Sequence, residues 1–78
     1  MQNKTEDLRN LRKTIGNNIH KERALRKVTL ARLSRLTGIR MKKLDQYELG
    51  KNMVRLEEVF FIARSLGVAA EKLFEAGN

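Results

Sequence analysis

Apolar residues recur at intervals of three and four along most of this chain, which is the spacing of amphipathic helices. The first such series comprises Leu8, Leu11, Ile15 and Ile19. It predicts one long helix that begins at a cap formed by Asn3 or Thr5 and ends near Lys27. Glycine inside a helix costs about 1 kcal/mol relative to alanine. Gly16 therefore leaves a break near residues 13–16 as the alternative.

The stretch from Thr29 to Gly50 predicts two short helices joined by a tight turn. The Thr29 hydroxyl is suited to capping the first helix, and Gly38 can end it because glycine adopts left-handed backbone angles without a Cβ clash. The apolar residues that would pack the two helices together are Leu33, Ile39, Leu44 and Tyr47. This arrangement is typical of a helix-turn-helix, with the second helix as the candidate reader of a DNA groove.

The last third of the chain predicts a helix that Gly67 ends, followed by a short final helix. The expected core-facing residues of the longer helix are Leu56, Val59, Phe60, Ala63 and Leu66. Phe61 lies outside this set, and an exposed phenylalanine indicates a surface that another group covers. It could belong to a twofold interface with Arg64, the tail around Leu73 and, from the first helix, Leu8. Alternatively, Phe61 could pack inside the chain, and the end of the first helix could simply be frayed.

The composition favours one small helical domain. The chain has 78 residues with no proline and no cysteine, so neither a disulfide nor a thiolate zinc site can form. A core of this size is only marginally stable without a partner. No stretch resembles a signal peptide or the run of about 20 apolar residues that spans a membrane. We therefore expect an all-α, cytoplasmic protein.

Positive charge is concentrated in one half of the chain. The net charge is +8, and residues 9–43 carry 12 of the 17 Lys and Arg residues but a single acid, Glu22. Residues 44–78 carry 4 basic and 6 acidic residues. The basic half contains the predicted helix-turn-helix, so one side of the molecule would face a polyanion. The alternative is an ordinary solvated helix surface.

The chain offers little for catalysis. His20 is the only histidine, and it falls on a polar helix face, where a surface role is usual. Glu57 and Glu58 follow the start of a predicted helix, where carboxylates complement the helix dipole. There is no metal-ligand spacing, nucleophile constellation or glycine-rich phosphate loop, so we expect neither an enzyme nor a cofactor.

An ordered series of residues extends from Ile15 to Phe74. It comprises Ile15, Gly16, Ile19, Arg23, Thr29, Leu33, Gly38, Ile39, Leu44, Tyr47, Glu48, Gly50, Leu56, Val59, Ala63, Leu66, Gly67, Val68, Leu73 and Phe74. In this series and its spacing, the chain resembles the Cro and phage-repressor type of helix-turn-helix family, also called XRE-type. The resemblance implies a compact five-helix, lambda-repressor-like domain over residues 14–76, preceded by a helical extension over residues 1–13.

The resemblance also implies roles for single residues. Arg23 would pair with Glu48 and set the angle of the recognition helix on the first helix. The side chains expected to face base edges from the helix Arg40 to Leu49 are Met41, Lys42, Lys43 and Gln46. Lysine suits guanine, glutamine suits adenine and methionine suits a thymine methyl, although phosphate contact alone is the alternative for both lysines. The expected phosphate contacts are Thr29, Arg40, Lys51, Asn52 and Arg55.

Three residues depart from the family pattern. Leu30 stands where the family has a glutamine that grips phosphate, and Arg40 stands where it has a serine or threonine. Arg32 replaces an acid. These changes alter the phosphate clamp and add positive charge, which favours affinity over discrimination.

Together these features predict a sequence-specific DNA-binding transcriptional regulator of the nucleoid. It would be a dimeric repressor or controller that reads an inverted-repeat operator. One alternative is a protein-interaction module that keeps the helix-turn-helix as a scaffold and docks a toxin or an RNA polymerase subunit through Phe61 and the N-terminal helix. Another is a nonspecific architectural DNA binder, which follows from the same basic half.

Overall fold

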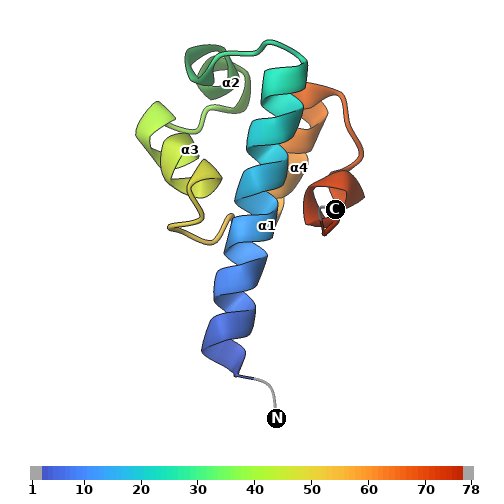
Figure 1. Cartoon of the computed structure of the whole chain (residues 1–78). Coiled ribbons are helices and arrows are strands. Elements are labelled where there is room, and N and C mark those ends of the chain that lie inside the picture. The colour runs from blue at the N-terminus through green and yellow to red at the C-terminus, as the bar shows by residue number, and fades with distance from the viewer. Residues whose placement is uncertain (1–2, 77–78) are drawn as a thin grey trace.

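The computed structural model describes residues 3–76 as a set of helices with short connections (Figure 1). They are α1 (Lys4–Leu25), α2 (Leu30–Thr37), α3 (Met41–Glu48), α4 (Leu56–Leu66) and a 3-10 helix, η1 (Ala70–Phe74). This part of the chain contains no strand, so the all-α class is confirmed. None of the helices in residues 3–76 is long and apolar enough to cross a membrane.

The long first helix is present as predicted. Asn3 caps α1, because its side-chain oxygen accepts hydrogen bonds from the backbone N–H groups of Thr5 and Glu6 at 3.0 and 3.3 Å. The N-terminal part of α1 extends beyond the other helices (Figure 1), and Leu8 is 50% exposed there. Residues 4–13 are therefore continuous with the packed part of α1, while residues 1 and 2 of the predicted extension lie outside the described residues.

Gly16 does not break α1 but allows α3 to approach it. A Cβ atom at Gly16 would lie 2.1 Å from the carbonyl oxygen of Tyr47 and 2.9 Å from that of Glu48. Both separations are far below van der Waals contact, so only glycine fits here. The distance between α1 and the end of α3 is set by this contact.

The connection between α2 and α3 follows the predicted caps. The Thr29 hydroxyl accepts a hydrogen bond from the backbone N–H of Arg32 at 3.1 Å, which satisfies one free donor at the start of α2. Gly38 has a φ of 77°, the left-handed conformation expected after a helix. The Ser34 hydroxyl then donates to the carbonyl of Ile39 at 2.5 Å. This bond holds the start of α3 against the end of α2.

The core collects apolar side chains from every element and from the loop before α4. Its members are Ile15, Ile19, Leu33, Ile39, Leu44, Tyr47, Val54, Val59, Ile62, Ala63, Leu66 and Leu73. The expectation for α4 was wrong in part, since Leu56 and Phe60 are 64% and 56% exposed whereas Ile62 is fully buried. Val59, Ala63 and Leu66 fit either of two overlapping helical stripes, and packing against α2 and η1 selects the one that contains Ile62.

Leu73 also lies elsewhere than expected. It is completely buried in the core, so its proposed part in a twofold interface is wrong. The adjoining backbone is fixed by Asn18 of α1, whose side-chain N–H group donates to the carbonyls of Leu73 at 2.9 Å and Glu75 at 2.7 Å. Asn18 is itself buried, and these two bonds satisfy both N–H donors of its side-chain amide.

Candidate nucleic-acid interface

The two sides of α3 differ in burial. Leu44 and Tyr47 point into the core and are 0% and 1% exposed. Met41 is 48% exposed, Lys42 is exposed and Gln46 is half-buried on the other side. A shallow hollow of about 360 Å³ runs along this side, lined by Arg40, Lys42, Lys43, Gln46 and Asn52. The structure thus brings three predicted base-facing residues and two predicted phosphate contacts to one surface.

The loop after α3 is tied to this surface by one hydrogen bond. The side-chain N–H group of Asn52 donates to Oε1 of Gln46 at 2.8 Å. The bond orients the Gln46 amide, and it leaves the amide N–H donors and one lone pair of Oε1 free for another partner. Asn52 therefore acts on the helix as well as on the loop, a link that the sequence pattern did not indicate.

Lys43 also borders this hollow, but its ammonium group is directed toward α4. Its Nζ atom donates to Oε2 of Glu58 at 3.2 Å and lies 5.7 Å from the centre of the Tyr47 ring. The Tyr47 hydroxyl donates to the other oxygen of Glu58 at 2.5 Å. These contacts with Tyr47 and Glu58 raise the pKa of Lys43. Burial favours the neutral form of Glu58, but the two hydrogen bonds outweigh it and lower the pKa of this carboxyl group.

Asp45 is an exposed residue of α3 that the sequence analysis did not single out. At about 100° per residue it falls between Met41 and Lys42 around the helix, so it shares their surface. A carboxylate there disfavours close phosphate contact, but it can accept a hydrogen bond from a cytosine amino group. The helical spacing could have indicated Asp45, because it stands one turn after Met41 and so shares the solvent-facing side of the helix.

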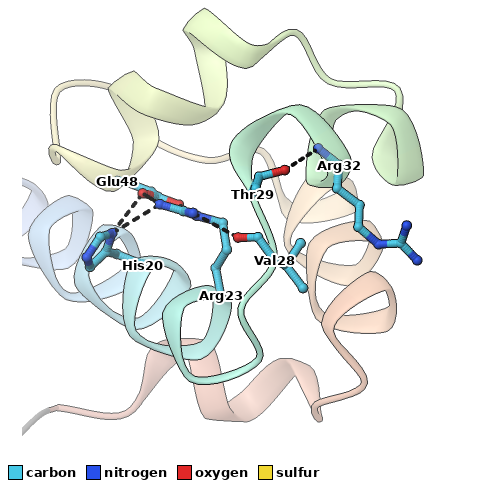
Figure 2. A network of polar contacts seen from close by, with 6 residues as sticks. All are labelled: His20, Arg23, Val28, Thr29, Arg32 and Glu48. Atoms are coloured by element: carbon cyan, nitrogen blue, oxygen red, sulfur yellow. Dashed lines mark hydrogen bonds and ion pairs between the residues drawn. The ribbon is translucent and has the colours of Figure 1, made fainter.

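The other end of α3 is fixed to α1 by the predicted ion pair (Figure 2). Arg23 donates from Nε and Nη2 to the two carboxylate oxygens of Glu48, at 2.7 and 2.9 Å, and from Nη1 to the carbonyl of Val28 at 2.9 Å. His20 Nδ1 lies 3.0 Å from Oε1 of the same carboxylate. The Glu48 side chain is only 7% exposed. The pairing of Arg23 with Glu48 is confirmed.

The charges of this pair are mutually stabilised. Burial would raise the pKa of Glu48, but hydrogen bonds from Arg23 and His20 outweigh it and lower the pKa below 4.5. The hydrogen bond to Glu48 likewise raises the pKa of Arg23. Both groups therefore stay ionised in a mostly desolvated position, and they also bridge α1, α3 and the segment before α2.

The remaining predicted phosphate contacts lie at helix ends. Arg40 and Arg55 stand at the N-caps of α3 and α4 with no side-chain capping bond, and both are exposed. They line a second hollow, of about 340 Å³, together with Lys43 and Phe61. Thr29 is exposed at the start of α2, and Lys51 is exposed beside Asn52. Arg40 belongs to both hollows, so they adjoin one another.

The described residues, 3–76, contain no group of three or more acidic or histidine side chains placed to hold a metal ion. Neither a family model nor a curated protein sequence matches the chain.

Proposed function

We propose that the protein is a sequence-specific DNA-binding regulator in which α2 and α3 form a helix-turn-helix and α3 enters the major groove. The observation that carries this proposal is the division of α3 into two sides. Leu44 and Tyr47 anchor one side in the core, while Met41, Lys42 and Gln46 are available on the other. An α-helix about 10–12 Å across fits a major groove about 12 Å wide.

The exposed side chains of α3 have the chemistry for reading bases. Lys42 can donate to guanine, and Gln46, oriented by Asn52, retains a donor and an acceptor for adenine. Met41 can contact a thymine methyl group, and Asp45 can accept from cytosine. This mixture of donors, acceptors and apolar groups supports sequence-specific reading over a purely electrostatic role.

The excess of basic residues in the half of the chain that contains α2 and the start of α3 supports phosphate binding. Residues 9–43 carry 12 basic residues and one acid, and that acid, Glu22, is already paired with Arg26. Arg40 and Lys51 flank α3 at its two ends. If a dimer neutralises about 6 phosphates, the logarithm of affinity should fall against the logarithm of salt concentration with a slope of roughly −5.

Selection from randomised duplex DNA, with the winners retested at two salt concentrations, tests the proposal. We expect an inverted repeat with half-sites about 10 base pairs apart, bound at least about a thousandfold more tightly than random DNA. Salt-sensitive binding without a consensus would instead support an architectural role. No binding at low salt would overturn the proposal.

Matched variants separate base reading from general charge. Gln46→Ala should weaken binding to the selected site by about tenfold and relax the preference at one base position. Lys42→Ala should do the same at another position. Lys21→Ala is the control, because it removes the same charge from an exposed residue of α1 beside η1, where it lines a hollow with Leu25 and Lys72. The control should leave the consensus unchanged.

A further inference from the structure

The outer side of α4 carries apolar side chains that nothing in residues 3–76 covers. Leu56, Phe60 and Phe61 are 64%, 56% and 48% exposed, whereas Val59 and Ile62 on the inner side are buried. Two adjacent half-exposed phenylalanines on one helix are unusual for a surface that meets only water. This side of α4 therefore exposes an apolar surface to solvent.

Two opposite charges lie on the same side of α4. Glu57 is exposed in its first turn and Arg64 in its last turn, and neither forms an ion pair within the described residues. Seven residues at about 100° each return Arg64 to within about 20° of Glu57, so both lie along one line of the helix. Phe60 and Phe61 stand midway along this line, about 50° to either side of it.

This arrangement is complementary to itself. A twofold axis perpendicular to α4, level with the midpoint between Phe60 and Phe61, sets Glu57 against Arg64 of the partner subunit. The same axis sets Phe60 against Phe60 of the partner subunit and Phe61 against Phe61 of the partner subunit. A twofold axis parallel to α4 would instead set Glu57 against Glu57 of the partner subunit, which is repulsive. The charges therefore select an antiparallel pair of helices.

We propose that α4 pairs with α4 of a second copy of this chain, antiparallel, with the two phenylalanines at the centre and an ion pair at each end. An aromatic centre with a charged margin matches the composition of stable protein interfaces. At the usual 8–10 Å between packed helix axes, side chains as long as Phe, Glu and Arg reach across. The proposal goes beyond DNA binding and is tested without DNA.

The oligomeric state of the full chain, measured by sedimentation velocity over a range of concentrations, tests the pairing. We expect a dimer for the unaltered chain. Glu57→Arg and Arg64→Glu should each weaken dimerisation by about tenfold or more, because each variant places two like charges together at both ends of the interface. An equimolar mixture of the two variants should form a heterodimer, since every facing pair is then of opposite sign. The double variant should again form a homodimer.

Glu71→Arg is the control for net charge, because it makes the same charge change on an exposed residue of η1. It should remain dimeric, and circular dichroism should show that all variants keep the helical fold. A monomeric unaltered chain at the highest concentration would overturn the proposal. So would single variants that stay dimeric, or a mixture that stays monomeric, because either result would require a different partner or geometry.

Discussion

The recognition helix candidate α3 is held from two sides in different ways. On the α1 side, backbone meets backbone at Gly16, and the carboxylate of Glu48 receives two hydrogen bonds from Arg23. On the α4 side, the hydrogen bonds run between side chains, from Tyr47 and Lys43 to Glu58. The first side has almost no freedom to adjust, whereas the second contains a flexible lysine.

The comparison separates two roles. The α1 side determines where α3 lies, because a change there must move a backbone. The α4 side determines where one lysine of α3 points. The two carboxylates show the same difference, since Arg23 beside Glu48 is 15% exposed while Lys43 beside Glu58 is 41% exposed. Desolvation makes the first pair the stronger constraint and leaves the second open to competition from solvent.

The largest loss of stability is expected from placing a side chain between the backbones of α1 and α3. Gly16→Ala places a methyl group 2.1 Å from a backbone carbonyl, so α3 must move or the chain must unfold. We expect a loss of at least about 3 kcal/mol in the free energy of unfolding, in spite of the higher helix propensity of alanine. Denaturant unfolding measures it. Asn17→Ala, at the exposed neighbouring position, should change stability little.

The next largest effect concerns the ion pair on the same side. Glu48→Gln keeps the shape of the side chain but leaves the guanidinium of Arg23 without a counter-charge. We expect a loss of about 2 kcal/mol, less than for a completely buried pair because Arg23 is partly exposed. If α3 binds DNA as proposed, DNA affinity should fall together with stability, because the angle of α3 depends on this pair. A variant with unchanged thermal stability would contradict the structural role of the pair.

Acid should weaken the interactions that hold α3 against α1 and against α4. The folded-state pKa values of Glu48 and Glu58 are lower than the ordinary value of 4.5. Their contribution to stability is therefore present above about pH 4.5 and is lost as the pH falls through the folded-state values. Urea unfolding between pH 7 and pH 3 should show this loss, and it should be smaller in Glu48→Gln. An identical pH dependence in the variant would contradict the lowered pKa of Glu48.

The parts of this fold that could be predicted depend on local chemistry. The caps at Asn3 and Thr29 and the turn at Gly38 follow from residues that are near in sequence. The pair of Arg23 with Glu48 spans 25 residues, and it was predicted only through the family resemblance. Gly16 was recognised as unusual in a helix, but its reason is the backbone of α3, which no local pattern contains.

The parts that could not be predicted depend on which of several surfaces is covered. In α4, residues 56–66 contain more apolar side chains than one helical side can bury, so periodicity alone allowed Phe60 in place of Ile62. Glu58 was explained by the helix dipole, and its bond to Tyr47 became visible only when α3 and α4 were seen together. Lys43 was predicted to face bases together with Lys42. Its ammonium group instead binds Glu58 of α4, a partner that the pattern of α3 alone does not contain.

The smallest change in stability is expected on the α4 side. Glu58→Gln keeps an acceptor for the Tyr47 hydroxyl but removes the charge that holds Lys43, and we expect a loss of about 1 kcal/mol in unfolding free energy. If α3 binds DNA as proposed, the released lysine can reach a phosphate, so affinity should rise and the salt slope should steepen by about 1. Glu71→Gln removes the same charge from an exposed position in η1. Because both variants gain the same net charge, only a greater gain in Glu58→Gln shows that Glu58 withholds Lys43 from DNA. Equal gains would mean that the α4 side contributes to the fold alone.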